Sequence, residues 1–365
     1  MSPKIFSYYL PQFHQIPEND AWWGEGFTEW TNVKKAKPLF PFHNQPLVPG
    51  ELGYYHLNNV DIMYRQADLA KNYGVDGFVF YHYWFGNGKV LLEKPLHNFL
   101  KEKKLDIKFC LCWANESWKG TWHGAGNRML QEQYYPGSND YLNHFSYLLP
   151  FFKDHRHLMV ENCPVFQVYI PESIPDLQVF MDVFETSARK NGFNGIYWIA
   201  VKSNPLWIGK DSRFQGMVNS NLSQINKYLT KRVSSLILRL GFNNPWIRGL
   251  LKLPKTIEYE SVRTCLEDFS NSYNKDFFPL AIPNWDNTPR TKNEGTVYLR
   301  ATPEAFQNHL YSCLLQASKL PSDRQFVFVK SWNEWAEGNI LEPTQKLGKA
   351  FLESVRKAKS QFDVV

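Results

Sequence analysis

The 365-residue sequence lacks the features that mark several protein classes. It has no run of 18 apolar residues, so we expect no membrane-spanning helix. Its five cysteines are odd in number and match no zinc-ligand spacing. No strand-like run is followed by a glycine-rich dinucleotide or P-loop fingerprint, and no Asp-x-Asp pair is present. We therefore expect neither a bound cofactor nor a metal ion.

The N-terminal sequence and the cysteines both indicate the same cellular compartment. Strand-like sequence begins at Ile5, which leaves no room for a signal peptide after Met1. Cys110 and Cys112 alternate along one expected strand, as small buried side chains do in a reduced compartment. If Met1 is the native start, we expect a cytoplasmic protein.

Positive charge is concentrated in one segment. The net charge is only +6, but residues 212–257 contain no acidic residue and eight basic ones: Arg213, Lys227, Lys231, Arg232, Arg239, Arg248, Lys252 and Lys255. Apolar residues recur between them at helical spacing, at Ile225, Tyr228, Leu229, Leu236, Ile237 and Leu240. One interpretation is peripheral contact of 225–255 with an anionic inner membrane. The other, which we favour, is an inserted helical lid on the fold. We expect no nucleic-acid partner.

Strand-like and helical stretches alternate along the whole chain. The expected strands are Ile5–Gln12, Gly77–Phe85, Asp106–Trp113, Pro164–Ile170, Gly195–Val201, Phe278–Trp285 and Gln325–Trp332. The expected helices are Asp61–Asn72, Pro95–Lys103, Asp140–Lys153, Asp176–Lys190, Pro303–Ala317 and Gly348–Lys359. An eighth unit can lie within 203–276. This order predicts a single α/β domain over residues 1–365, a (β/α)8 TIM barrel with long βα loops and an inserted helical subregion at 205–260.

Aromatic and polar residues gather where the expected strands end, which is where such barrels carry their active sites. The composition includes 13 Trp and 19 Tyr, whose polar tips need partners. An aromatic-rich core is one explanation, and a cleft lined by rings that stack on sugars is the other. The candidate binding residues after the strands are Tyr8, Tyr9, His14, Tyr81, His82, Trp84, Trp113, Asn115, Glu116, Trp118, Trp285, Asp286, Arg290, Trp332 and Asn333.

The loop Ala21–Asn32 supplies further candidates. It places three tryptophans, two glutamates and two glycines in twelve residues, which is not typical of a core segment. We expect it to roof the cleft, with a structural cap over the barrel as the alternative. Its candidate binding residues are Trp22, Trp23, Glu29 and Trp30.

Glu334 and Glu337 are the candidate catalytic residues. Cleavage of a glycosidic bond usually needs two carboxyl groups beside the anomeric carbon. These two follow the last expected strand, three residues apart, with Trp332 and Trp335 beside them to exclude water. A solvated helix start is the alternative explanation of such a pair. Glu342, in the same loop, is expected to support it.

The sequence resembles the WbsX-type proteins, which are related to the endo-mannosidases of glycoside hydrolase family 99. The matching segments are Tyr8–His14, Trp22–Asn32, Phe80–Phe85, Cys112–Trp118, Pro283–Arg290 and Ser331–Pro343. The endo-mannosidases carry a Glu-Trp-x-Glu-Gly motif, which Glu334–Gly338 matches, with Ala336 where they tend to have His. The resemblance implies that Glu337 is the general acid/base. It also implies that Glu334 deprotonates the sugar 2-hydroxyl, giving an anhydro-sugar intermediate and net retention.

Three functions are compatible with these features. The first is a retaining glycoside hydrolase or transglycosylase acting on an oligo- or polysaccharide, such as a bacterial-type surface polysaccharide. The second is a glycosyltransferase of O-antigen or capsule synthesis, the usual label of WbsX-type proteins. The third is a glycan-binding barrel without activity. The intact glutamate pair disfavours the third, and the missing phosphate-binding motifs disfavour the second.

Overall fold

A parallel sheet forms the centre of the computed structural model, which describes residues 2–120, 128–202, 213–218, 220, 222–233, 249, 251–269 and 276–364. Its strands pair in the order β12-β10-β9-β8-β4-β2-β1-β15-β13, so neighbours in space are mostly neighbours in sequence. Their bounds are β1 (Lys4–Tyr9), β2 (Gly77–Trp84), β4 (Lys108–Trp113), β8 (Cys163–Val168), β9 (Tyr197–Ala200), β10 (Gly216–Val218), β12 (Asp276–Phe278), β13 (Leu280–Ala281) and β15 (Phe326–Val329).

Pro279 joins the two ends of this strand path. It lies between β12, which pairs with β10, and β13, which pairs with β15. Proline lacks the N–H that a continuous ladder needs, but its carbonyl accepts a hydrogen bond from the Phe328 amide at 3.0 Å. β12 and β13 are therefore consecutive pieces of one interrupted barrel strand. The sheet closes through them, and the prediction of a (β/α)8 barrel is confirmed.

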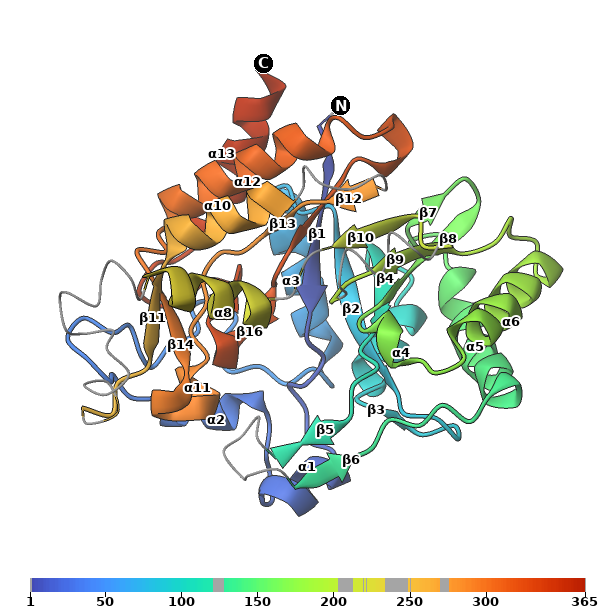
Figure 1. Ribbon diagram of the computed structural model, residues 1–365, viewed down its shortest axis with the longest axis horizontal. Coiled ribbons are helices and arrows are strands. Elements are labelled where there is room, and N and C mark those ends of the chain that lie inside the picture. Colours follow the sequence, from blue (N-terminus) through green and yellow to red (C-terminus); the bar gives the residue numbers. More distant parts are fainter. Residues whose placement is uncertain are drawn as a thin grey trace.

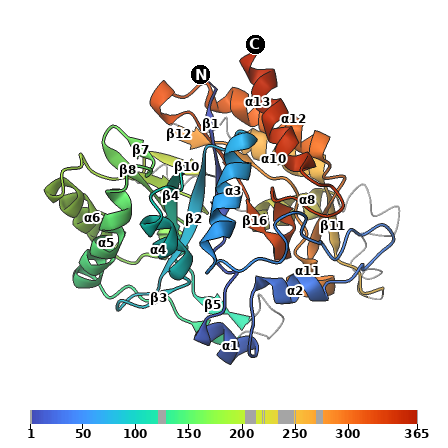
Figure 2. The same cartoon turned by 180° about the vertical axis from the view of Figure 1, so that it is seen from behind.

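Helices surround the barrel on its outside (Figures 1 and 2). They are α3 (Val60–Asn72), α4 (Lys94–Lys101), α5 (Ser138–Phe152), α6 (Leu177–Lys190), α8 (Leu222–Val233), α10 (Tyr259–Phe269), α12 (Pro303–Ala317) and α13 (Ala350–Asp363). Local sequence sets several of their starts. The Asn59 side chain accepts from the Asp61 amide at 3.0 Å, and the Thr302 hydroxyl accepts from the Ala305 amide at 3.2 Å.

Two glycines leave space for phenylalanine rings inside the N-terminal end of the barrel. A Cβ atom on Gly77 would lie 2.4 Å from the Phe6 ring, and one on Gly216 would lie 2.4 Å from the Phe278 ring. No side chain fits in that space, so the sequence needs glycine at both positions. Phe6 and Phe278 fill the interior instead, and both are fully buried. This packing closes the end of the barrel that lies away from the site.

Short elements form the opposite end, beyond the arrowheads of β1 and β2 in Figure 1. They are α1 (Pro17–Trp23), α2 (Glu29–Lys35), β5 (Trp118–Lys119), β6 (Met129–Gln131) and α11 (Thr288–Thr291). The loop after β15 adds β16 (Asn333–Glu334), a 3-10 turn at Trp335–Glu337, and β17 (Asn339–Ile340). The βα loops therefore build the C-terminal face, as expected for this fold.

The largest differences between the expected and the observed elements lie after β9. The strand expected at Phe278–Trp285 ends at Ala281, because Pro279 and Pro283 limit regular pairing there. β10 supplies the unit expected within 203–276. β11 (Lys255–Glu258) and β14 (Thr296–Leu299) form a separate parallel pair that was not expected.

The basic segment 212–257 is described at its start, through α8, and at its end, from residue 251 into β11, but most of 234–250 is not described. Ile225 and Leu229 of α8 are buried, whereas Lys227 and Tyr228 are exposed. α8 packs against α10 and β11, so its apolar face is covered by protein. Leu236, Ile237, Arg239, Leu240 and Arg248 lie outside the described residues. Among the residues that are described, no helix is both long and apolar enough to cross a bilayer.

Candidate active site

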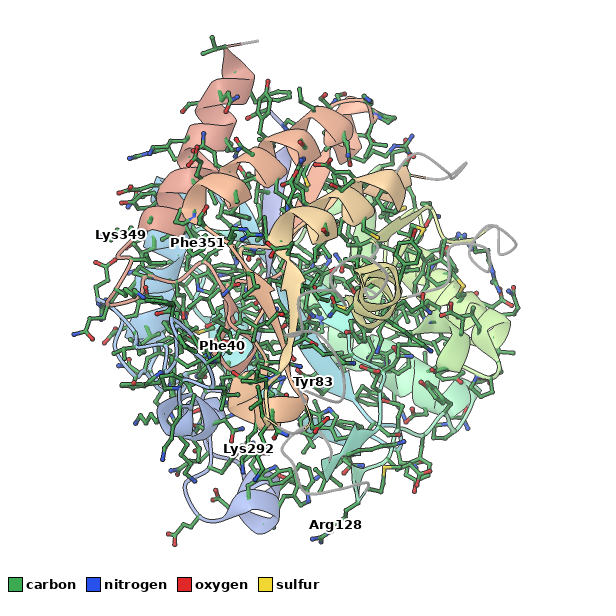
Figure 3. All side chains as sticks on the ribbon, turned by 60° about the vertical axis from the view of Figure 1, so that its left-hand side comes forward. Phe40, Tyr83, Arg128, Lys292, Lys349 and Phe351 are labelled. Atoms are coloured by element: carbon green, nitrogen blue, oxygen red, sulfur yellow. The ribbon has the colours of Figure 1, made fainter. Side chains whose placement is uncertain are left out.

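A cleft opens at the C-terminal end of the strands. It holds about 800 Å³ of space, its open mouth included. Tyr81 and Tyr83 of β2 form part of its floor, and Trp22, Trp23 and Trp118 stand along its walls. Figure 3 labels Tyr83, above Lys292 and Arg128 in that view. The remaining lining residues are Leu10, Gln12, Asn19, Ala114, Glu116, Lys119, Leu130, Tyr169, Arg290, Lys330, Glu334 and Glu337.

The loop after β15 brings Glu334 and Glu337 together. β16 and β17 pair antiparallel, with Glu334 opposite Asn339, and the 3-10 turn between them ends at Gly338 with φ +66. A Cβ atom on Gly338 would also lie 3.0 Å from the Cβ of Asp286. Glycine therefore allows this tight hairpin to rest on the neighbouring loop. The two glutamate carboxyl groups are hydrogen-bonded to each other.

One cation stands beside each member of this pair. Arg290 Nη1 lies 2.6 Å from Glu337 Oε1, and Lys330 Nζ lies 3.7 Å from Glu334 Oε1. Burial raises the pKa of Glu334 to about 8, and Lys330 only partly opposes this rise. Burial also acts to raise the pKa of Glu337, but Arg290, Glu334, Lys330 and Asn339 together outweigh burial and leave that pKa below its usual value. The surroundings therefore favour the protonated form of Glu334 and the ionised form of Glu337.

Arg290 connects this pair to the roof of the cleft. Its Nε donates to Glu29 Oε1 at 3.0 Å, while Nη1 donates to Glu337. Glu29 begins α2 and is fully buried, and burial raises its pKa although Arg290 opposes the shift. The guanidinium thus holds the segment around α2 and the catalytic hairpin in one arrangement.

Glu342 supports the hairpin from behind. Its Oε1 accepts from Gln66 Nε2 at 2.6 Å and Trp332 Nε1 at 2.9 Å. Its Oε2 accepts from Trp335 Nε1 at 2.6 Å and the Tyr55 hydroxyl at 2.9 Å. These four neutral donors favour the carboxylate, but burial dominates and raises the pKa of Glu342 to about 7. The supporting role expected for Glu342 agrees with this position.

The structure brings together many of the residues that the sequence singled out. The candidates that line the cleft are Trp22, Trp23, Tyr81, Glu116, Trp118, Arg290, Glu334 and Glu337. They come from β2, α1, α11 and the loops after β4 and β15. Glu29 reaches this group through Arg290. Their convergence fits the expectation of one cleft at the C-terminal face.

The other candidates are not among the residues that line the cleft. Tyr8 donates to Gln167 Oε1 at 2.8 Å inside the barrel, and Tyr9 donates to Gln66 Oε1 at 2.7 Å. His82 is hydrogen-bonded to His144 at 2.9 Å. Hydrogen bonds to other parts of the fold hold His14, Trp30, Trp84, Trp113, Asn115, Asp286, Trp332 and Asn333. The half-buried Trp285 is not among the lining residues, but its ring lies 6.0 Å from Lys330 Nζ.

The alternation of side chains along a strand explains this division. Tyr81 and Tyr83 face the cleft, so His82 and Trp84 point to the other side of the sheet. There His144 of α5 stacks on Trp84, with ring centres 4.8 Å apart. Similarly, Asn333 accepts from the Leu10 amide at 2.7 Å and ties the catalytic hairpin to β1. These residues support the site from outside the cleft.

Two functional candidates escaped the sequence analysis. Asn19 of α1 lines the cleft and is buried, and neither polar atom of its side chain has a hydrogen-bond partner among the residues that the structure describes. Lys330 lies on the cleft floor beside Glu334. Its signal was available, because it is the single charge that ends the apolar run Phe326–Val329. No three His, Cys, Asp or Glu side chains gather as metal ligands in the part of the chain that the structure describes.

Comparison with known proteins places the chain in a family. Residues 5–355 match the model of the family described as Glycosyltransferase WbsX, so the chain belongs to the WbsX family. The protein WxcX of Xanthomonas campestris pv. campestris is 35% identical over 359 residues, which cover 97% of this chain and 49% of WxcX. The chain thus spans about half the length of the curated relatives it matches.

Solved structures share the fold at low sequence identity. The GH99 endo-alpha-mannosidase from Bacteroides thetaiotaomicron superposes with a TM-score of 0.60 at 13% identity, over 99% of this chain and 97% of the enzyme. A glycoside hydrolase-like protein gives a TM-score of 0.60 at 12% identity, over 98% of this chain and 94% of its own. These likenesses establish the barrel fold alone.

Proposed function

We propose that this chain is a retaining glycan-active enzyme, a glycoside hydrolase or transglycosylase, with Glu334 and Glu337 as its catalytic residues. The observation that carries the proposal is the hydrogen-bonded carboxyl pair on the floor of an aromatic-lined cleft, with the pKa of Glu334 raised and the pKa of Glu337 lowered. Such a pair has one group ready to give a proton and one ready to accept it. The WbsX family and the endo-alpha-mannosidase fold agree with a carbohydrate substrate.

The closeness of the pair favours a reaction through the sugar's own 2-hydroxyl. Carboxyl groups that stand apart on the two sides of the anomeric carbon are about 5–5.5 Å apart in retaining enzymes and about 6.5–9.5 Å apart in inverting ones. Two hydrogen-bonded carboxyl groups are closer than either. They are suited to act on neighbouring oxygens of one sugar, the 2-hydroxyl and the leaving oxygen.

The proposed reaction begins with a proton shift within the pair. The resting proton moves from Glu334 to Glu337 along the hydrogen bond that joins them, so that Glu334 becomes the base. Glu334 then accepts the proton of the 2-hydroxyl, O2 attacks C1, and the leaving oxygen takes the proton of Glu337. The product is a 1,2-anhydro sugar. Water or another acceptor then opens it with Glu337 as base, while Glu334 returns its proton to O2.

The cleft walls fit a glycan in this reaction. Trp22 and Trp118 lie edge to face with ring centres 5.9 Å apart, and Tyr83 packs edge to face on Trp118 at 5.1 Å. Flat rings present apolar surface to the C–H faces of sugars, and their polar tips suit a half-wet cleft. We propose a bacterial-type surface polysaccharide or a related glycan as the substrate class.

Transfer to a sugar acceptor is the second candidate outcome. The description of the WbsX family as glycosyltransferases favours it. The proposed anhydro-sugar intermediate is compatible with both hydrolysis and transfer, since a hydroxyl of another sugar can open the anhydro ring in place of water. Synthesis of O-antigen or capsule would need that outcome.

The test is to incubate the purified protein with a panel of capsular and O-antigen polysaccharides, with and without added oligosaccharide acceptors. Mass spectrometry detects cleaved or lengthened products, and NMR gives their anomeric configuration. We expect products that retain the configuration of the cleaved bond. Inverted products would contradict the proposed mechanism, and no product from the whole panel would contradict the proposed activity.

A further inference from the structure

Lys330 is a buried ammonium on the floor of the cleft. It follows β15 directly, and the residue is 6% exposed. Its Nζ donates to the Tyr81 hydroxyl over a long 3.3 Å and lies 3.7 Å from Glu334 Oε1, beyond a normal hydrogen bond. An ammonium group carries three N–H donors. In the described part of the chain, one of these has a hydrogen-bond acceptor.

The surroundings keep this cation charged and directed at the catalytic pair. Glu334 and Glu337 raise the pKa of Lys330 against the effect of burial, which acts to lower it, while Arg290 and Cys112 are the other titratable groups that act on it. The rings of Tyr81 and Trp285 lie 5.9 and 6.0 Å from Nζ. Among the described residues, Lys330 is thus a charged donor with N–H groups left unused, next to the base of the proposed reaction.

Arg290 cannot take the same role. Its guanidinium is already engaged by Glu29 and Glu337, and it stands on the Glu337 side of the pair. Lys202, near the rim, is paired with Glu116 at 2.9 Å. Lys330 stands on the Glu334 side, which is the side where the proposed reaction creates negative charge.

We propose that Lys330 is a third catalytic residue, whose ammonium stabilises the negative charge that forms on the sugar O2 while Glu334 accepts the 2-hydroxyl proton. This inference rests on the proposed function. O2 is bonded to the proton that Glu334 takes, so an oxygen in that position lies within reach of a cation 3.7 Å from the Glu334 carboxyl. Lys330 keeps its own proton throughout: the proton goes from O2 to Glu334, and the electron pair of O2 forms the bond to C1.

Lys330 also prepares Glu334 for this step. The resting proton lies on Glu334, and it must leave before Glu334 can act as a base. A cation at 3.7 Å favours the ionised carboxylate, which makes the proton shift to Glu337 easier. One residue therefore acts on two consecutive stages of the same proton transfer.

The first experiment compares wild type, Lys330→Met and the remote surface control Lys346→Met on the polysaccharide that the wild type cleaves. Methionine keeps the length and removes the charge. Loss of one donor to a developing oxyanion lowers kcat by about 10²–10³-fold. Because the charge forms only in the transition state, we expect the lower kcat with KM changed less than threefold. A raised KM with unchanged kcat would instead assign Lys330 to ground-state binding and overturn the inference.

A second experiment reads the charge effect without substrate. Glutamate labelled with ¹³C at its carboxyl carbon reports the titration of the pair by NMR, with Glu334→Gln and Glu337→Gln used for assignment. Lys330→Met should raise the upper pKa of the pair by about one unit, because it removes an opposite charge within 4–6 Å. An unchanged titration would contradict the preparatory role.

Rescue separates a catalytic role from a structural one. In Lys330→Ala, added propylammonium should raise kcat at least tenfold over the same variant without it, since a small cation can enter the space that the lysine side chain leaves. Propan-1-ol, which has the same number of non-hydrogen atoms and no charge, is the matched control. Failure of rescue in a variant that unfolds like the wild type overturns the inference, as does equal rescue by both compounds. If the wild type cleaves nothing on the panel, the proposed function fails and this inference fails with it.

Discussion

Gln66 donates from Nε2 to Oε1 of Glu342 across 2.6 Å, and this bond links helix α3 to the loop that carries the catalytic pair. Within the described ranges of the chain, no ion pair involves the carboxyl group of Glu342, and two tryptophans and a tyrosine supply its other donors. The hairpin is therefore anchored on a buried acid whose charge is held by neutral groups alone. Such an acid makes the stability of the fold depend on pH.

The first prediction concerns this dependence. A carboxyl group with a raised folded pKa binds its proton more tightly in the folded chain, so its contribution to stability is lost as pH rises through that pKa. The pKa of Glu342 is raised to about 7. Between pH 4 and pH 7 the wild type should lose about 3 kcal/mol of unfolding free energy relative to Glu342→Gln. Urea denaturation across this range measures the difference, and parallel pH curves would show that Glu342 does not titrate there.

Exchange of each catalytic glutamate for glutamine gives the second prediction. Glu337→Gln and Glu334→Gln should each lower turnover by at least about 10²-fold, as expected when a general acid or base is lost. On a glycosyl fluoride, whose leaving group needs no proton, Glu337→Gln should recover activity and Glu334→Gln should not. Near-normal turnover by Glu337→Gln on the natural polysaccharide would remove it from the acid role. Thermal denaturation should confirm that both variants fold.

The third prediction concerns Arg290 and its two acidic partners. Arg290→Met leaves Glu29 buried without its cation, so we expect a loss of about 3–5 kcal/mol in unfolding free energy. Glu29→Gln combined with Arg290→Met removes both charges, and this double variant should recover most of that loss. Chemical denaturation of the four proteins forms a double-mutant cycle. Additive effects of the two changes would show that the ion pair at 3.0 Å contributes no coupling.

The sequence predicts the architecture well because the apolar pattern within each βα unit indicates its strand and its helix. Apolar runs of strand length alternate with helical periods, and Pro303–Ala317 is helical over the expected residues. The proposed catalytic pair was also visible as a candidate, since two glutamates three residues apart follow an apolar strand. The faces of the strands were not predictable in the same way. Every residue of β2 is buried, so no polar alternation distinguishes Tyr81 and Tyr83 from His82 and Trp84.

Side-chain neighbours were the other unpredictable feature. Glu29 and Arg290 are far apart in sequence, and only the closed barrel brings them into contact. Lys330 lies within the expected strand Gln325–Trp332, and the sequence alone does not show which side chains its own side chain meets. Its place beside Glu334 depends on the path of the hairpin that follows. The position of the proton within the catalytic pair depends in turn on both cations.

The fourth prediction tests the division between cleft-lining and supporting aromatic residues. Trp22→Ala should raise KM about tenfold, equal to about 1.4 kcal/mol of lost stacking, with little change in stability. Trp113→Ala should cost about 3–5 kcal/mol of unfolding free energy, because Trp113 is 1% exposed and its removal leaves a cavity. Kinetics and denaturation of both variants measure these effects. The reverse pattern would place the sugar on the other side of the sheet.

The last prediction concerns the basic segment. In its described part, Ile225 and Leu229 are buried against the protein, because α8 packs on α10 and β11. A helix that binds a membrane surface needs its apolar face free. We therefore expect a lid and no binding to vesicles of phosphatidylserine and phosphatidylcholine in a flotation assay at low salt. Charge reversal at the exposed Lys227 should then change the affinity for an acidic polysaccharide, measured by calorimetry. Flotation that weakens as salt is added, and that Lys227→Glu reduces, would instead place the segment on an anionic membrane.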